Sequence, residues 1–486
     1  MWREERLFIG GELVAAEDGA TYENYSPYTE ELIGVAADAS LADVRRAISA
    51  ARTAFDTSEW SRDTALRVRC LRQLHQALVD HADHLRQILV QELGMPLRST
   101  YGAGLDAPTN SVEWYADALE TFDFTTDLGV VEVFGGKHRR WVEKEAAGVV
   151  AAIVAYNYPF QLALAKLAPA LAAGCTVVLK GAPQTPWSAL ALGRLIAENT
   201  DIPAGVVNVI TSSSADVSAE LTVSAEVDLV TFTGSTPVGK RIMASASGTV
   251  KRVFLELGGK SALVVLDDAD LDAAAMTAAY HVTSHSGQGC AVLSRMIVPR
   301  ARYDDIAARV TEVLQSVKVG DPAVLQTSMG PLVSAEQREK VSGYVDRAIA
   351  AGAKAVIGGR VPESQDKGHF YAPTLIVGAD EDSEIAQDEL FGPVLVMLPH
   401  DGDEDAIRIA NNSPFGLSGG VMSQDRERAL KVARGVRTGT FSVNGGVYFG
   451  PDAPFGGYKQ SGFGREMGLT SFDEFLEGKT LAEPVV

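Results

Sequence analysis

VVAAIVAYNYPFQLALAKLAPALAAGCTVVLK, residues 149–180, holds the pattern that decides the fold of this chain. Val149 to Val154 is a short apolar run, which predicts a buried strand. Leu162 to Ala173 has the length and apolar content of a helix, and Thr176 to Leu179 predicts a second strand. This order indicates a βαβ unit of a parallel sheet. Because parallel sheets bind ligands outside the carboxyl ends of their strands, we expect the chemistry in the loops that follow them.

The same alternation continues along most of the chain. Val206 to Ile210 and Leu229 to Phe232 extend the first series, and Ala262 to Leu266 begins a second one. The expected fold class is therefore α/β, with two Rossmann-like parallel-sheet domains. Residues 122–142 differ, because two β-rich runs flank the turn-prone pair Gly135-Gly136 and predict a hairpin. An exposed hairpin edge can pair with another chain, so we expect a small β oligomerisation arm.

Composition limits the classes of partner. The chain carries a formal net charge of -20, whereas nucleic acids and anionic membranes attract basic surfaces, so we expect neither as a partner. The uncharged stretch 146–165 contains Asn157, Pro159 and Gln161 near its middle, and unpaired polar groups are costly in lipid. The three cysteines show neither a disulfide framework nor zinc-ligand spacing, and the N-terminus lacks the apolar core of a signal peptide. We expect a cytoplasmic protein without a metal site.

Three separated residues are candidates for catalysis. Cys290 ends the run SGQGC, where glycines free the backbone around a thiol, although a lone cysteine is more often a small buried hydrophobe. Glu256 lies between two leucines and before two glycines, and desolvation there would raise its pKa and make it usable as a base. A glutamate paired with a lysine is the commoner case. Asn157 could donate to an oxyanion or could merely hold a turn.

The run FTGSTPVG, residues 232–239, is a candidate anion site. A strand ends at Phe232 and a helix begins near Thr236, with Pro237 suited to its first turn. Amides at a helix N-terminus attract phosphate, and Ser235 can add a hydroxyl donor. The run is neither the three-glycine dinucleotide fingerprint nor a P-loop, so an ordinary strand-to-helix turn remains equally open.

Taken together, these motifs resemble the aldehyde dehydrogenase superfamily of the NAD(P)-dependent, hydrolytic, non-CoA-acylating type. The resemblance extends from about Phe8 to Lys479, and the run DELFGP at 388–393 and the late glycine-rich run PFGG at 454–457 also match. It implies a Cys290 nucleophile, a Glu256 general base and an Asn157 oxyanion donor, with Lys180 as a further site residue. The implied cofactor-binding residues are Lys180, Pro183, Gly234, Ser235, Gly239, Leu257, Glu389 and Phe391.

The resemblance also implies a reaction and a division of the chain. An aldehyde would be oxidised to a carboxylic acid through a Cys290 thiohemiacetal and thioester, and water activated by Glu256 would hydrolyse the thioester. Residues 1–121 and 143–258 would form the NAD(P)-binding domain, and residues 259–460 the catalytic domain. Residues 122–142 and 461–486 would form the oligomerisation arm and C-terminal tail of a homodimer or homotetramer.

Three departures from the family pattern bear on specificity. Pro183 stands where the family often has a glutamate that binds the adenosine ribose and would repel a 2′-phosphate, and the absence of this carboxylate weakens the case for strict NAD use. We expect NAD and keep NADP open. Ala165 replaces a tryptophan, and Gly289 and Ala291 flank Cys290 where larger residues are common. These small residues enlarge a pocket, which favours a bulky aromatic, terpenoid or polycyclic aldehyde. The expected pocket residues are Tyr158, Gln161, Ala165, Gly289, Ala291 and Phe455.

Other classes remain as alternatives. A CoA-acylating aldehyde dehydrogenase would not need Glu256 to activate water. His285 could serve Cys290 as the base of a thiol hydrolase, but the Ser235 and Glu389 motifs would then lack a purpose. Intact catalytic residues count against a non-enzymatic structural member of the family. His281 and His285 have the spacing of two metal ligands but lack a third, so a packed helix is the better interpretation.

Overall fold

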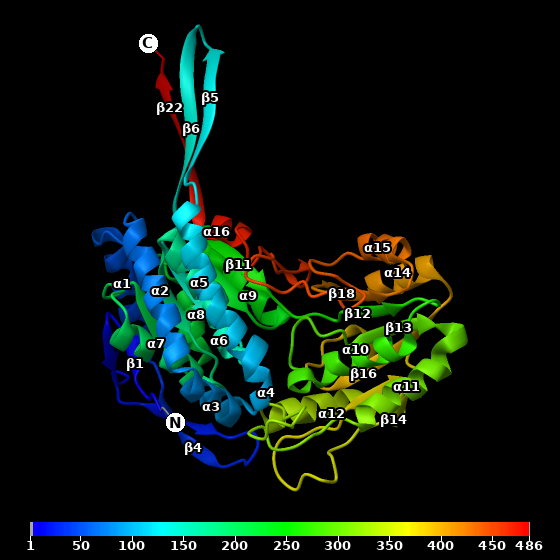
Figure 1. The fold of residues 1–486 in the computed structure, drawn as a ribbon. Coiled ribbons are helices and arrows are strands. Elements are labelled where there is room, and N and C mark those ends of the chain that lie inside the picture. Colours follow the sequence, from blue (N-terminus) through cyan, green and yellow to red (C-terminus); the bar gives the residue numbers. More distant parts are fainter. Residues whose placement is uncertain (1–2, 486) are drawn as a thin grey trace.

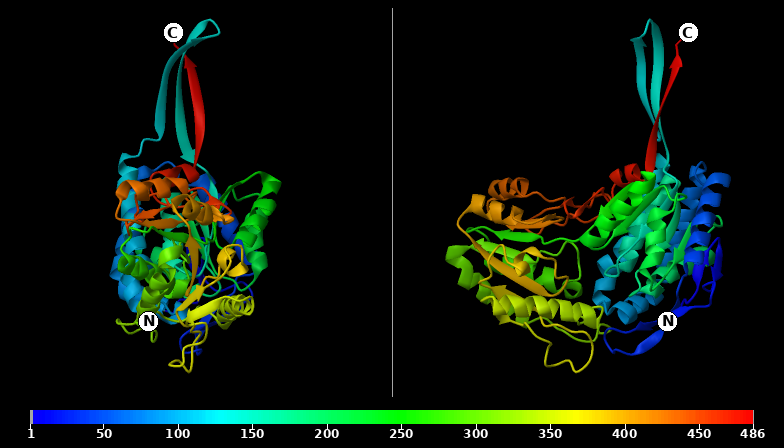
Figure 2. Two further views of the ribbon diagram at one scale, coloured as in Figure 1. Left: turned by 90° about the vertical axis from the view of Figure 1, so that its right-hand side faces the viewer. Right: turned by 180° about the vertical axis from the view of Figure 1, so that it is seen from behind.

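The computed structural model describes residues 3–485 as two sheets with their helices and a narrow arm that projects from the body (Figure 1). Two further views show the arm standing clear of the body on all sides (Figure 2). The predicted α/β class with two parallel-containing sheets is confirmed. Among residues 3–485, no helix combines the length and apolar content needed to span a bilayer.

The first sheet positions the site through a reversal in its strand order. The order is β2-β1-β9-β8-β7-β10-β11-β21, and the neighbours from β9 to β11 run parallel. After β7 the chain builds β8 and β9 on one side, and it then crosses to build β10 and β11 on the other. A crevice opens at such a switch point, outside the carboxyl ends of the strands. The strands are β1 (Leu7–Ile9), β2 (Glu12–Val14), β7 (Val149–Ile153), β8 (Thr176–Lys180), β9 (Val207–Ile210), β10 (Leu229–Thr233), β11 (Arg252–Glu256) and β21 (Gly462–Phe463).

Helices cover both faces of this sheet. The helix between β7 and β8 is buried along its whole length, which explains why its sequence is apolar on every face apart from Gln161 and Lys166. The helices are α1 (Leu41–Thr57), α2 (Thr64–Asp80), α3 (Ala82–Leu93), α4 (Leu97–Ser99), α5 (Asp106–Thr121), α6 (Pro159–Ala173), α7 (Pro186–Asn199), α8 (Ala215–Val223) and α9 (Thr236–Ala246). A small antiparallel pair, β3 (Thr21–Tyr25) and β4 (Leu32–Ala37), precedes α1.

The second sheet has the order β14-β15-β16-β13-β12-β18-β19, and only β14 runs antiparallel to its neighbour. Its strands are β12 (Ala262–Val265), β13 (Arg295–Pro299), β14 (Lys354–Ile357), β15 (Thr374–Val377), β16 (Val394–His400), β18 (Gly419–Met422) and β19 (Ser442–Val443). Its helices are α10 (Leu271–Thr283), α11 (Tyr303–Gln315), α12 (Ala335–Ala350), α13 (Glu384–Gln387), α14 (Asp403–Asn411) and α15 (Arg426–Gly435). The short strands β17 (Phe415–Gly416) and β20 (Tyr458–Lys459) pair beside it.

The arm is a three-stranded antiparallel sheet. The predicted hairpin is present as β5 (Thr125–Val133) and β6 (Gly136–Ala146), and β6 therefore continues past residue 142. The last strand, β22 (Leu476–Pro484), pairs with β6 after the short helix α16 (Thr470–Glu474). The tail also supplies β21, which pairs with β11 in the first sheet rather than in the arm. The division of the chain into domains stays a prediction.

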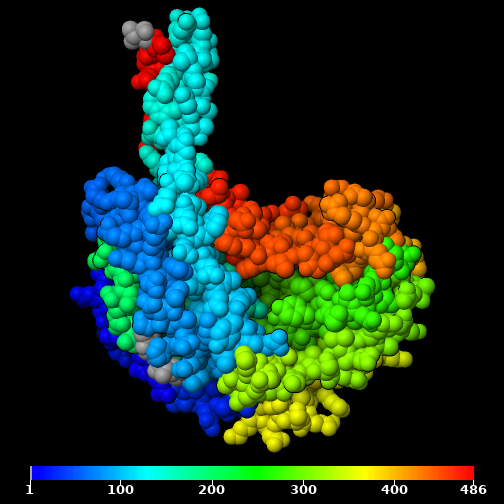
Figure 3. Space-filling view, in the orientation of Figure 1, coloured from blue at the N-terminus to red at the C-terminus, as the bar shows by residue number. Residues whose placement is uncertain are grey.

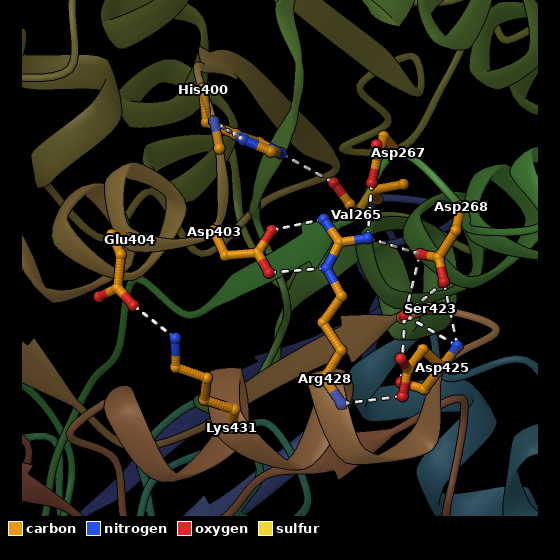
Figure 4. Close-up of polar contacts among 11 residues, drawn as sticks. Val265, Asp267, Asp268, His400, Asp403, Glu404, Ser423, Asp425, Arg428 and Lys431 are labelled. Carbon is orange, nitrogen blue, oxygen red and sulfur yellow. Dashed lines mark hydrogen bonds and ion pairs between the residues drawn. The ribbon is translucent and has the colours of Figure 1, made fainter.

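Arg428 of α15 ties three segments of the second domain together (Figure 4). Its guanidinium forms ion pairs with Asp267, after β12, and with Asp403, at the start of α14, each at 2.6 Å. Both oxygens of Asp403 accept hydrogen bonds from it. The hydroxyl of Ser423 donates to Asp268 at 2.9 Å in the same cluster. The hydrogen bond from Arg428 lowers the pKa of Asp403 and the pKa of Asp267.

Replacing Arg428 by methionine should lower the free energy of unfolding by about 1 to 2 kcal/mol, the range for partly screened hydrogen bonds to charged groups. Because the folded pKa of Asp403 is lowered, this stabilisation is present above the unfolded pKa of about 3.9 and is lost as the pH falls through the folded pKa. Urea unfolding at about pH 7 measures the loss of stability, and its continuation below about pH 3.9 measures the pH dependence. Arg426→Met is the matched control, since Arg426 pairs only with the exposed Glu427. An equal loss in both variants would contradict the prediction.

Candidate active site

A cavity of about 190 Å³ lies at the carboxyl ends of β7, β10 and β11, where the switch point places it. Asn157 follows β7, Ser235 follows β10 and Glu256 ends β11, while Cys290 and Glu389 come from the second domain. The predicted site residues that line it are Asn157, Gly234, Ser235, Glu256, Leu257, Cys290, Glu389 and Phe391. Ala155, Tyr156, Thr233, Gly258, Gln337 and Lys340 complete the wall.

Three predicted cofactor residues lie outside this lining. Gly239, on α9, allows that helix to approach β11, because a Cβ there would lie 2.7 Å from the Leu257 side chain. Lys180 is the last residue of β8, with 5% of its surface exposed, and Pro183 follows in the next loop. Their roles toward a cofactor stay predictions.

The other side of Cys290 faces an apolar wall. Leu417, Phe455 and Met467 form a small cluster, and Cys290, Ala291 and Tyr448 pack against it. Phe455 and Ala291 were predicted pocket residues, whereas no sequence motif indicated Leu417, Met467 or Tyr448. The space-filling view shows a hollow between the cyan helices of the first domain and the green segment of the second (Figure 3).

The predicted pocket residues of α6 share one face of that helix. Gln161, Leu162 and Ala165 of α6 keep 8%, 7% and 3% of their surface exposed, and this spacing places them on one helical face. Tyr158, just before the helix, packs edge-on against the His285 ring with a centroid distance of 5.2 Å. Gly289 leaves room beside Cys290, because a Cβ there would meet only the Val292 side chain, at 3.0 Å. Their role in binding a substrate stays a prediction.

The loop that carries Cys290 is held in a strained conformation. His285 and Ser286 have φ of 47° and 57°, in the left-handed region that non-glycine residues rarely adopt. The Ser286 hydroxyl donates to the Gly330 carbonyl at 2.6 Å, and the Gln288 side-chain oxygen accepts from the Val333 amide at 3.0 Å. The Asn157 amide donates to the Gln288 carbonyl at 3.0 Å. The oxyanion candidate and the nucleophile loop are therefore joined by a direct hydrogen bond.

His285 does not share a helix with His281, and that expectation is wrong. The helix α10 ends at Thr283, and His285 lies in the turn beyond it. Its ring is fully buried, and neither ring nitrogen has a hydrogen-bond partner among the described residues. Burial lowers the pKa of His285 to about 4, so the ring is neutral at physiological pH.

The surroundings of the Cys290 thiol disfavour its ionisation. Burial raises its pKa, and the negative charges of Glu256, Glu389 and Glu466 raise it further. The backbone amide of Cys290 acts in the opposite direction. Since only the thiolate is a strong nucleophile, the site needs positive charge or donors near the sulfur before it reacts.

Glu256 is a buried carboxyl group without a partner. Its side chain is 2% exposed, and neither oxygen accepts a hydrogen bond from any of residues 3–485. Burial raises its pKa well above the ordinary value, and the negative charge of Glu466 adds to this effect. Gly456 leaves space beside it, because a Cβ there would lie 2.7 Å from Oε1. Because the raised pKa makes its ionised form a stronger base, Glu256 can take a proton from water.

Lys166 and Glu466 form a buried ion pair that sequence reasoning missed. The Nζ–Oε1 distance is 2.5 Å, and the side chains are 0% and 4% exposed. Both charges act on Glu256, where Glu466 raises the pKa and Lys166 lowers it. The signal was present in the sequence, because the single charged residue of a largely apolar helix must find a buried partner.

Gln337 is a second residue that sequence reasoning missed. Its side-chain amide donates to the carbonyls of Leu390 and Phe391, each at 2.9 Å. Phe391 has a φ of 62°, a strained value for a bulky residue. Gln337 therefore holds the turn that follows Glu389. The nearby Glu389 carboxylate accepts from the Gly259 amide at 3.0 Å, and burial raises its pKa to about 7.

Comparison with known proteins agrees with this geometry. Residues 13–481 match the model of the aldehyde dehydrogenase family. The chain belongs to the aldehyde dehydrogenase family. Members of this family are oxidoreductases that act on aldehydes.

Several aldehyde dehydrogenases resemble this one over nearly the whole chain. A 3-succinoylsemialdehyde-pyridine dehydrogenase of Pseudomonas sp. is 39% identical over 479 residues, with 98% of each chain covered. The betaine aldehyde dehydrogenase of Bacillus subtilis is 36% identical over 486 residues, with 98% of this chain and 96% of the relative covered. The crystal structure of a Staphylococcus aureus betaine aldehyde dehydrogenase in complex with NAD+ superposes with a TM-score of 0.95 at 34% identity, covering 98% and 94% of the chains.

The negative charges around the Cys290 thiol of this aldehyde dehydrogenase should control how readily it is alkylated. Glu256→Gln removes the largest charge that raises the Cys290 pKa, so half-maximal alkylation by iodoacetamide should move to lower pH. Alkylation at about pH 8 should accordingly be faster than in the unchanged protein. Peptide mass spectrometry distinguishes Cys290 from the fully buried Cys70 and Cys175. Glu120→Gln removes an exposed carboxylate of α5 and should leave the profile unmoved. A slower reaction in the Glu256 variant would contradict the prediction.

Proposed function

We propose that this chain oxidises an aldehyde to a carboxylic acid with NAD+ and water, with Cys290 as nucleophile and Glu256 as general base. One observation carries the proposal. A single cavity brings together a thiol, an unpartnered buried carboxyl group and an amide donor, and these come from three segments far apart in the sequence. Each of the three groups matches one step of the reaction.

The residues divide the chemistry between them. The Cys290 thiolate adds to the aldehyde carbon, and the oxygen gains negative charge that Asn157 and the Cys290 amide can stabilise. When bound, NAD+ accepts the hydride that leaves this carbon, and a thioester remains on Cys290. Water then attacks the thioester while Glu256 takes its proton, which releases the acid and the thiolate. A CoA-acylating enzyme would not need this base.

The residues at the switch point fit a dinucleotide. Ser235 lies at the N-terminus of α9, where helix amides favour phosphate. Lys180 offers a buried ammonium group with no hydrogen-bond acceptor among residues 3–485, and burial lowers its pKa to about 8. Glu389 can accept from ribose hydroxyls on the other side of the cavity. The NAD+ complex of the Staphylococcus aureus relative supports NAD as the cofactor.

The wall on the substrate side supports a bulky, ring-bearing aldehyde. Cys290 packs against the apolar cluster of Leu417, Phe455 and Met467, and Gly289 leaves space beside it. Ala165 places a short side chain on the same face of α6 as Gln161. The name of the Pseudomonas relative places a pyridine ring on its aldehyde substrate. Aromatic, terpenoid and polycyclic aldehydes therefore fit better than the small cation betaine aldehyde.

The exposed arm supports self-association as a homodimer or homotetramer. Leu128, Val130 and Phe134 are exposed on it, and the outer edges of β5 and β22 pair with no described strand. The described cysteines are all free, which fits a reducing compartment such as the cytoplasm.

Variants of the proposed nucleophile and of the proposed base should differ in how much reduced nicotinamide they form. Cys290→Ala should bind NAD+ but form no reduced nicotinamide. Glu256→Gln should release about one equivalent of reduced nicotinamide per active site and then stop, because the thioester is not hydrolysed. Stopped-flow absorbance without coenzyme A measures both. Steady turnover by the Cys290 variant, or a requirement for coenzyme A in the unchanged protein, would overturn the proposal.

The size of the pocket can be tested at Ala165. Ala165→Trp should lower kcat/KM for cinnamaldehyde and citral by about tenfold or more, because the ring fills the space beside Gln161. Acetaldehyde should be affected much less, and it serves as the control within the same variant. The panel is run with NAD+ and NADP+ on both proteins. Poor turnover of ring-bearing aldehydes beside fast acetaldehyde oxidation by the unchanged protein would contradict the proposed substrate class.

A further inference from the structure

Lys180 is a buried cation that lacks an acceptor. Its side chain is 5% exposed at the carboxyl end of β8, and no described residue accepts a hydrogen bond from its ammonium group. Burial lowers its pKa, and the only charge that acts in the opposite direction is that of Asp38. An ammonium group on a largely buried side chain is costly when no protein group accepts from it, unless water or a ligand completes its surroundings. Lys180 therefore points to a ligand with oxygen acceptors beside the switch point.

Asp38 brings a carboxylate to the same place from a distant part of the sequence. It follows β4, and its oxygens accept from the Ser212 hydroxyl at 2.8 Å, the Ser213 amide at 2.9 Å and the Ser213 hydroxyl at 2.5 Å. Burial acts to raise the pKa of Asp38, but the hydrogen bonds from Ser213 and Ser212 and the charge of Lys180 outweigh it, so the pKa is lowered. Asp38 is therefore ionised at neutral pH.

The donors that Asp38 occupies are those that a phosphate group would need. Ser213 lies just before α8, whose N-cap is Ser214, so an amide, two hydroxyls and a helix N-terminus gather here. Ser212 lies two residues beyond Ile210, which pairs with Lys180 in the sheet. This combination binds phosphate in many proteins. The Asp38 carboxylate takes up these donors as an internal anion.

We infer that Asp38 sets the choice between NAD and NADP by excluding the ribose 2′-phosphate. The inference rests on the proposed function, in that it places the adenosine ribose of the cofactor at Lys180. A 2′-hydroxyl can accept from the Lys180 ammonium group without conflict. A 2′-phosphate would bring its charge close to the Asp38 carboxylate and would find the serine donors already used. Asp38 thus supplies the negative charge beside the adenosine ribose from another segment, because Pro183 carries no charge.

The test is Asp38→Asn in the full chain, which keeps the shape and one acceptor oxygen but removes the charge. The ratio of kcat/KM with NADP+ to that with NAD+ should rise about fivefold, the size of one screened charge interaction. Turnover with NAD+ should be retained. Titration calorimetry with AMP and with adenosine 2′,5′-bisphosphate should show the same relative gain for the second ligand.

Two further variants separate charge at this place from other effects. Asp216→Asn removes an exposed carboxylate from the first turn of α8 and should leave the ratio unchanged. Pro183→Glu, added to Asp38→Asn, should restore the preference for NAD+, because it returns a carboxylate to the loop after Lys180. Should Asp38→Asn fail to fold, Asp38→Ser removes the same charge and tests the same ratio.

Failure of the Asp38 inference and failure of the proposed function would give different results. If the unchanged protein oxidises aldehydes with NAD+ and the Asp38 variants shift neither the kinetic ratio nor nucleotide binding, Asp38 only braces the turn before α8 and the inference is overturned. If no aldehyde is oxidised but the bisphosphate gains affinity over AMP in the variants, the inference stands and the proposed function fails. Equal effects of Asp216→Asn and Asp38→Asn would also overturn it.

Discussion

The hydrogen bond from the Asn157 side chain to the Gln288 carbonyl is the contact on which the site depends. It joins residues 131 positions apart, one after β7 of the first sheet and one in the loop before Cys290. That loop is strained at His285 and Ser286, and bonds to Gly330 and Val333 hold it in place. Cys290 can therefore be held beside Asn157 only while the segment after β7 and the loop after α10 keep their relative positions.

Burial of charge is the second constraint. Glu256, Cys290 and the pair Lys166–Glu466 lie close enough to influence one another, and all except the partly exposed Cys290 are buried. Burial holds both the carboxyl group and the thiol toward their neutral forms. The positive charge of a bound nicotinamide would favour the thiolate, so cofactor binding and activation of the nucleophile are coupled through electrostatics. A paired Lys166–Glu466 unit supplies polarity near Glu256 without adding net charge.

Much of this architecture could be predicted from local patterns. The apolar runs around Val149 and Thr176 and the helix between them predicted the βαβ unit, because burial on both faces removes polar residues from such elements. The hairpin at Gly135-Gly136 could also be predicted from local sequence, because its turn residues themselves favour a tight turn. His285 was misplaced because helix periodicity continued past the point where the backbone turns at Thr283. The end of that helix is set by contacts of Ser286 with Gly330, far along the chain.

The sequence by itself determined the fold class, the order of the elements and the candidates for the reactive groups, because each of these depends on short-range pattern or on residue chemistry. Only the tertiary structure decided which groups meet. Lys166 pairs with Glu466 across 300 positions, and Asp38 reaches Ser212 and Ser213 across more than a third of the chain. Such pairings are fixed by how sheets and loops pack in three dimensions, and the energy of a buried charge depends on every neighbour it has there. No local spacing carries that information.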